Sequence, residues 1–154
     1  RRLKGRVEVQ WILQTGREDY QWAKAEVERD GLPAKVLAFL RRIHMAYAAA
    51  DLVVCRSGAM TLAEIACCGT PAILVPYPYA IYDHQRGNAQ ALHERGAAQM
   101  ILDQDLTGTR LAECIRSYFT DPSRLERMAA AARAMGRPDA AAGIVEECYA
   151  LVGG

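Results

Sequence analysis

The sequence predicts an α/β domain built on a doubly wound parallel sheet of the Rossmann-like kind. Two observations predict this fold class. Short apolar runs alternate along the chain with segments that have helical periodicity, and this alternation is typical of strands joined by crossover helices. Several runs, among them "DLVVC" and "AILVP", are apolar at nearly every position, as strands are when helices cover both faces of their sheet.

The individual elements follow from local patterns. Runs rich in β-branched and other apolar residues predict strands over 7–13, 34–40, 51–55, 72–76 and 97–102. Apolar residues at helical spacing predict helices over 20–29, 43–50, 61–68, 84–96, 107–120, 123–135 and about 139–151. Turn residues end most of these segments, including Gly31, Gly69 and the Asp-Pro pair at 121–122.

Length, charge and composition exclude several classes of function. The 154 residues suffice for one domain, and a net charge of +1 gives no basic surface that predicts nucleic acid or membrane binding. No apolar run approaches the roughly 20 residues that a membrane-spanning helix needs, and no signal peptide is recognisable. The five cysteines form no C-x-x-C pair, so reduced thiols of a cytoplasmic protein are expected. The three histidines share no metal-ligand spacing with them, so no metal is expected.

The amino end departs from a complete nucleotide-binding domain. Such a domain has a glycine-rich turn after its first strand, and here the first glycine, Gly5, precedes the first expected strand. Either the fold lacks that strand–helix unit or the sequence starts inside a domain, so we expect residues 1–154 to be a single domain without its first strand–helix unit.

The stretch "RSGAMTLAE" lies where a strand gives way to a helix. Ligands of open α/β sheets bind beyond the carboxyl ends of the strands, where Gly58 and Ala59 would let the backbone approach a ligand closely. A helix N-terminus suits phosphate, and Ser57 and Thr61 could add hydroxyl donors. Arg56 could lie near the same anion or be solvated.

A second interpretation of this stretch is a capping box. In Thr61-x-x-Glu64, the threonine would cap the helix and the glutamate would reach back to it. Glu64 could instead accept hydrogen bonds from ribose hydroxyls, as acidic residues do in dinucleotide folds. The pattern alone leaves these alternatives open.

Polar residues also gather after the fourth expected strand, in "YPYAIYDHQRGNAQAL". Asp83, His84, Gln85 and Asn88 bring donors and acceptors to one loop and the first turn of a helix, which is the mixture that sugar hydroxyls require. The alternative is that Asp83 only caps the helix while Gln85 and Asn88 are solvated.

Together, "ADLVVCRSGAMTLAEIACCGTPAILVPYP" and "DHQRGNAQALHERGAAQMI" resemble the C-terminal half of the MurG family. These are bacterial peptidoglycan N-acetylglucosaminyltransferases with the GT-B fold. The resemblance is close over about residues 35–107 and looser toward the carboxyl end. It implies an inverting hexosyltransferase that moves GlcNAc from UDP-GlcNAc to lipid I, the undecaprenyl-linked muramyl pentapeptide, and forms lipid II.

The resemblance implies that residues 1–154 are a single nucleotide-sugar-binding domain, and it also implies a division of roles among residues. Glu64 would take the ribose hydroxyls, the backbone at Leu40 would read uracil, residues 57–61 would line the diphosphate, and His84 and Gln85 would face the GlcNAc hydroxyls. The complete set of expected UDP-GlcNAc contacts is Leu40, Arg56, Ser57, Gly58, Ala59, Met60, Thr61, Glu64, His84, Gln85 and Asn88.

Further expectations concern the parent enzyme. No catalytic residue and no cofactor is expected in these residues, because the family attributes its base, its acceptor contacts and its membrane surface to an N-terminal domain that is absent here. The chain alone is therefore expected to be inactive. The parent would be a cytoplasmic enzyme at the inner face of the bacterial plasma membrane. Alternatives are a non-catalytic UDP-sugar-binding subunit of a split transferase, a UDP-GlcNAc epimerase, and a transferase that uses UDP-galactose.

Overall fold

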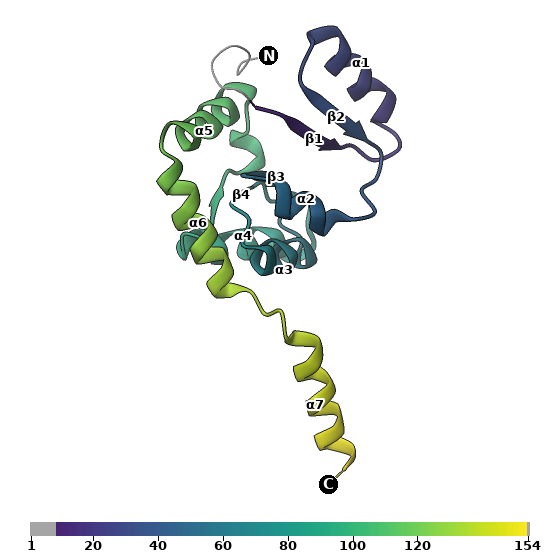
Figure 1. Ribbon diagram of the computed structural model, residues 1–154, viewed down its shortest axis with the longest axis vertical. Coiled ribbons are helices and arrows are strands. Elements are labelled where there is room, and N and C mark those ends of the chain that lie inside the picture. The colour runs from purple at the N-terminus through teal and green to yellow at the C-terminus, as the bar shows by residue number, and fades with distance from the viewer. Residues whose placement is uncertain (1–8, 154) are drawn as a thin grey trace.

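Strands and helices alternate through residues 9–153, the part of the chain that the computed structural model describes (Figure 1). The strands are β1 (Trp11–Gln14), β2 (Ala34–Leu37), β3 (Val53–Cys55), β4 (Ala72–Leu74) and β5 (Ala98–Met100). The helices are α1 (Tyr20–Asp30), α2 (Ile43–Ala49), α3 (Ala59–Cys68), α4 (His84–Glu94), α5 (Gly108–Thr120), α6 (Pro122–Met135) and α7 (Ala140–Val152). Short 3₁₀ turns, η1 (Ile81–Asp83) and η2 (Asp103–Asp105), precede α4 and α5. Each expected element is present, although residues 7 and 8 of the first expected strand lie outside the described part.

Every strand pair in the described residues is parallel, as predicted. β1 pairs with β2, and β4 lies between β3 and β5. The α/β class is therefore confirmed. One difference is that these strands form two sheets, because no ladder joins β1 to β3 within residues 9–153.

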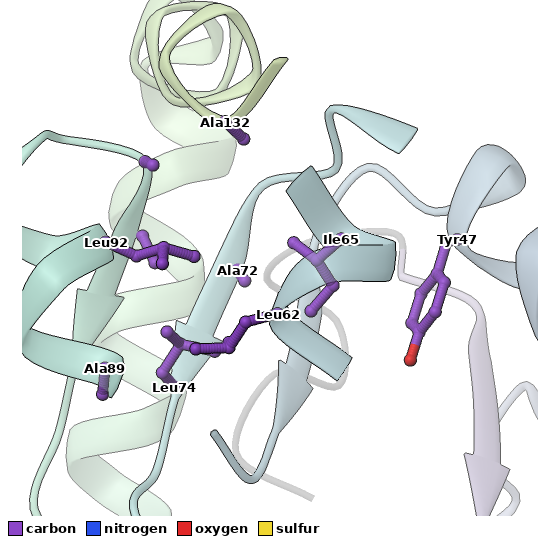
Figure 2. Packing of buried hydrophobic residues seen from close by; sticks show 10 residues of the cluster. Tyr47, Leu62, Ile65, Ala72, Leu74, Ala89, Leu92 and Ala132 are labelled. Atoms are coloured by element: carbon purple, nitrogen blue, oxygen red, sulfur yellow. The ribbon is translucent and has the colours of Figure 1, made fainter. Parts of the chain in front are cut away.

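The core lies on both faces of β4, the central strand of the larger sheet. Ala72 and Leu74 belong to one buried cluster and Ile73 to the other, because successive side chains of a strand point to opposite faces. Figure 2 shows the first cluster, to which α2, α3 and α4 contribute Tyr47, Leu62, Ile65, Ala89 and Leu92. On the other face, α5 and α6 contribute Ile115, Tyr118 and Met128. Layers on both faces explain why all three residues of β4 are fully buried.

The last helix, α7, extends away from the other elements, with the carboxyl end of the chain at its tip (Figure 1). None of its residues is buried. The exposed side chains include Ile144, Val145, Tyr149, Leu151 and Val152.

Candidate functional site

The junction between β3 and α3 differs from the prediction in one respect. α3 begins at Ala59, with Gly58 in the N-cap position and no side chain capping the helix. Thr61 therefore lies within the first turn, so the capping box of Thr61 and Glu64 is wrong. The first amides of a helix have no partner within it, and the first bond of α3 runs from Leu62 N to Gly58 O at 3.0 Å. The backbone amides of residues 59–61 thus form the uncapped, positive end of the helix.

The two polar stretches meet at one edge of the larger sheet, as predicted. Ser57 is fully buried, and its hydroxyl donates to the backbone oxygen of Gln85 at 2.7 Å. The side-chain amide of Asn88 donates to the backbone oxygen of Ser57 at 3.2 Å. These two bonds attach the start of α4 to the loop that precedes α3.

Hydrogen bonding fixes which polar atoms Gln85 and Asn88 still present. Gln85 Oε1 accepts from the backbone N–H of Tyr77 at 3.0 Å, which leaves its NH₂ group as a donor. Asn88 uses its NH₂ group on Ser57, which leaves its Oδ1 as an acceptor. The alternative in which both side chains are merely solvated is therefore wrong. Because the two residues are three apart on α4 and share a face, together they match a hydroxyl, which both accepts and donates.

The turn before α4 is held in an unusual backbone conformation. Tyr82 and Asp83 are both non-glycine residues with positive φ, at 54° and 53°. Asp83 occupies the N-cap position of α4, but its side chain makes no capping bond, so the expected cap is wrong. His84 is exposed, and its Nδ1 lies 2.6 Å from the backbone oxygen of Ile81. Such strain costs of order 1–3 kcal/mol per residue and is found preferentially at functional sites.

Arg56 stabilises the loop that leads from β4 to this turn. Its Nη1 lies 2.6 Å from Asp103 Oδ1 and donates to the backbone oxygens of Val75 and Pro76 at 3.3 and 3.1 Å. Its guanidinium also lies over the ring of Tyr77, 5.5 Å from the centroid. The side chain is therefore not simply solvated. Asp103 was not expected from the sequence, although its position just after the last strand places it at the same sheet edge.

Leu40 lies in the loop after β2, on the side of the smaller sheet. Its backbone N–H donates to Oε1 of Gln14, the last residue of β1, at 2.9 Å. Gln14 is another contact that the sequence did not reveal. Next to it is an open hollow of about 300 Å³ lined by Ile12, Lys35, Leu37, Leu40, Arg42, Met45, Ala46 and Ala49.

Glu64 is half-buried on α3 and lies close to the phenol of Tyr47 on α2. Burial, followed by the charge of the Glu64 carboxylate and a hydrogen bond to it, raises the pKa of Tyr47 from 10.0 to about 12. Burial also raises the pKa of the nearby Cys55 thiol from 9.0 to about 12.

These two groups predict an alkaline loss of stability. The folded state holds both protons more tightly than the unfolded state, so the stabilisation is complete below about pH 9 and lost as the pH rises through about 12. We expect the free energy of unfolding, measured by urea denaturation, to fall across this range. Cys55→Ala should flatten the decline, whereas Cys148→Ala, at an exposed position, should not. Equal slopes for both variants would contradict the assignment to Cys55.

The described part of the chain contains neither a cluster of metal-ligating side chains nor a membrane-spanning helix. Within residues 9–153, no group of three or more His, Cys, Asp or Glu side chains is placed to hold a metal ion. No helix in that range combines the length and the apolar character needed to cross a bilayer.

Parallel strands that lead into an uncapped helix N-terminus, with polar groups beside it, are an arrangement typical of nucleotide-binding α/β proteins. Comparison with known proteins identifies the family. The chain belongs to the glycosyltransferase family 28 C-terminal domain, which matches residues 1–144. The resemblance drawn from the sequence is thereby confirmed.

Two similar curated relatives share one name, UDP-N-acetylglucosamine–N-acetylmuramyl-(pentapeptide) pyrophosphoryl-undecaprenol N-acetylglucosamine transferase. The protein of Geobacter sulfurreducens is 46% identical over 147 residues, which cover 96% of this chain and 40% of the relative. The protein of Geobacter metallireducens is 48% identical over 134 residues, or 87% of this chain and 37% of the relative. The chain thus spans about two fifths of the length of these relatives.

Solved structures agree with the fold. Acinetobacter baumannii MurG superposes with a TM-score of 0.79 at 29% identity and covers 94% of this chain, which matches 47% of that protein. The glycosyltransferase VinC superposes with a TM-score of 0.62 at 22% identity, covering 85% of this chain and 32% of VinC. The VinC likeness supports the fold alone, and the expected GT-B architecture is confirmed.

Proposed function

We propose that this chain is the donor-binding part of an inverting glycosyltransferase that moves GlcNAc from UDP-GlcNAc to lipid I. The observation that carries the proposal is the similarity of nearly the whole chain to transferases of that name, at 46% identity over 96% of its length. The site geometry is consistent with a nucleotide sugar, because it combines a helix N-terminus with groups that suit hydroxyls.

The uncapped end of α3 would bind the diphosphate. Negative charge grows on the β-phosphate as UDP leaves the anomeric carbon, and the helix amides stabilise that charge more in the transition state than in the ground state. Gly58 has no side chain to shield them, and a Cβ built there would have only Thr61 Oγ1 within 4 Å, at 3.9 Å. Met60, which is 78% exposed, and Ala59 would border the same ligand. Ser57 would act indirectly, because its hydroxyl is already bonded to Gln85.

The remaining expected contacts would bind the nucleoside and the sugar. Glu64 would accept hydrogen bonds from the ribose hydroxyls, and the backbone at Leu40 would read uracil after the N–H of Leu40 leaves Gln14. The Gln85 NH₂ group and Asn88 Oδ1 would bind one or two GlcNAc hydroxyls. His84, held at the backbone of Ile81, would face the same sugar. Arg56 would serve this site by fastening the loop that carries Tyr77.

Other parts of a longer polypeptide would complete the enzyme. Residues 1–154 would form one domain, to which a preceding segment adds the first strand–helix unit and an N-terminal acceptor domain. That domain would supply the general base for the acceptor hydroxyl, so the chain alone would transfer no GlcNAc. The parent enzyme would lie in the cytoplasm against the inner face of the plasma membrane. We propose no cofactor, and neither nucleic acid nor direct membrane contact for these residues.

The test is a titration of the purified chain with UDP-GlcNAc, UDP-galactose, UDP and ADP, followed by amide NMR spectroscopy. UDP-GlcNAc and UDP should shift the amide resonances of residues 58–61 and 84–88, and ADP should not. Shifts confined to other surfaces would contradict the proposed site. Equal affinity for UDP-galactose and UDP-GlcNAc would contradict the proposed donor.

A further inference from the structure

One arginine joins the carboxyl ends of three neighbouring strands. Arg56 directly follows β3, and Asp103 comes shortly after β5. The Nη1 atom of Arg56 lies 2.6 Å from Asp103 Oδ1. It also donates to the backbone oxygens of Val75 and Pro76, which directly follow β4, at 3.3 and 3.1 Å. Because β4 lies between β3 and β5, the Arg56 side chain crosses the end of the central strand to reach Asp103.

The peptide group between Pro76 and Tyr77 is held at both of its polar atoms. Its oxygen accepts from Arg56, and its N–H donates to Oε1 of Gln85 at 3.0 Å. In a trans peptide these two atoms point in opposite directions, so the arginine on one side fixes where the N–H points on the other. A carbonyl that accepts from a cation also polarises its own peptide and strengthens the bond that the N–H donates.

This peptide N–H determines the orientation of the Gln85 side-chain amide. The amide has an accepting oxygen and a donating NH₂ group, and an N–H can be met only by the oxygen. While the N–H of Tyr77 points at Gln85, the NH₂ group is therefore the end that faces a ligand. Ser57 holds only the backbone oxygen of Gln85, at 2.7 Å, so it does not select the orientation of the side chain.

We propose that Asp103 is a positioning residue: through Arg56 and that peptide group, it keeps the NH₂ group of Gln85 directed at a hydroxyl of the donor sugar. This inference rests on the proposed function, because it assumes that Gln85 binds the sugar. Asp103 supplies the opposite charge and the shortest of the three contacts of Nη1, so it determines where the guanidinium lies. Its removal should therefore affect binding of the sugar and not of the nucleotide.

The decisive variant is Asp103→Ala, measured by isothermal titration calorimetry of the purified chain with UDP-GlcNAc and with UDP. We expect the affinity for UDP-GlcNAc to fall about three- to fivefold, the upper range for a partly exposed ion pair. The affinity for UDP should change less than about twofold, because UDP carries no sugar. In a Gln85→Ala background, Asp103→Ala should cause no further loss for UDP-GlcNAc.

The same 3₁₀ turn offers a matched control, Asp105→Ala. The side chain of Asp105 is 40% exposed, against 38% for Asp103, and it pairs with Arg110 at 3.6 Å. This variant removes an equally exposed carboxylate from the turn but leaves the contacts of Arg56 in place. It should therefore bind both ligands as the unchanged chain does.

A ligand-free measurement checks the contacts themselves. By NMR, the Tyr77 amide hydrogen should exchange with solvent at least about threefold faster in Asp103→Ala, because its bond to Gln85 opens more often. Asp105→Ala should leave this rate unchanged. An unchanged rate in Asp103→Ala would overturn the proposal, whichever ligands the chain binds.

Different failures have different meanings. If Asp103→Ala weakens UDP-GlcNAc and UDP equally, or weakens neither, the positioning role is overturned while the donor-binding role of the chain stands. Tighter binding of UDP would also overturn it, because the released Arg56 would then be a diphosphate contact. If Gln85→Ala leaves the affinity for UDP-GlcNAc unchanged, or the chain binds neither ligand, the proposed function fails and this inference fails with it.

Discussion

Replacing Glu64 by alanine is expected to weaken UDP binding by about 1.5–3 kcal/mol, which corresponds to roughly a tenfold to hundredfold rise in Kd. The loss follows from the proposed role, because a carboxylate that accepts two ribose hydroxyls makes charge-assisted hydrogen bonds that alanine cannot replace. Isothermal titration calorimetry with UDP gives the Kd directly. UDP-GlcNAc should lose the same factor, since the change affects the nucleoside rather than the sugar.

The structure makes this variant a clean probe of binding. Glu64 is not part of a cap of α3, so its loss should leave the helix N-terminus and the diphosphate contacts in place. Glu147→Ala is a suitable control, because Glu147 is exposed on α7. A Glu64→Ala protein that unfolds more easily but binds UDP with unchanged affinity would show that Glu64 has only a structural role.

Gly136→Ala is expected to destabilise the domain by about 1–3 kcal/mol, the usual cost of overpacking. A Cβ at Gly136, which directly follows α6, would lie 2.8 Å from the backbone oxygen of Ala66 and 3.1 Å from Cys67 Cα. These are backbone atoms of α3 and cannot rotate away. The φ of Gly136 is −63°, so alanine would fit the local conformation and the cost is steric alone. Urea denaturation of the two proteins would measure it.

The chain offers a matched control for this change. A Cβ at Gly143, inside α7, would meet nothing within 4 Å, and alanine favours a helix over glycine by about 0.5–1 kcal/mol. Gly143→Ala should therefore cost no stability. If Gly136→Ala were equally harmless, α3 and the end of α6 would not approach as closely as the structure shows.

Local sequence patterns predicted most helices and strands, because these elements depend mainly on residues that are neighbours in the chain. The least accurate part of this prediction was the start of α3. The hydroxyl of Thr61 favoured a cap there, yet Gly58 takes the N-cap position, and a glycine gives only a weak signal for this role. The turn at Tyr82 and Asp83 gave no signal at all, since neither residue is a glycine despite its positive φ.

The contacts that complete the site join residues far apart in the chain. Arg56 meets Asp103 across 47 positions, and the backbone of Leu40 meets Gln14 across 26. No residue near Arg56 in the sequence indicates which carboxylate will pair with it. The sequence could place Arg56 and Asp103 at the carboxyl edge of a sheet, but only the three-dimensional structure shows that they form an ion pair. The separation of the strands into two sheets could not be predicted from the spacing of apolar residues either, because that spacing indicates which residues are buried and not which strands pair.

That separation has a consequence for cooperativity. Because no backbone hydrogen bonds of a ladder join β1 to β3 in the described residues, the unit of β1, α1 and β2 can open at a lower free energy than the body around β4. Leu40 follows the smaller unit, whereas Glu64 belongs to the larger one. A nucleotide that contacts both units would stabilise each of them against opening alone. With nucleotide bound, the two units would therefore unfold together, as one cooperative unit.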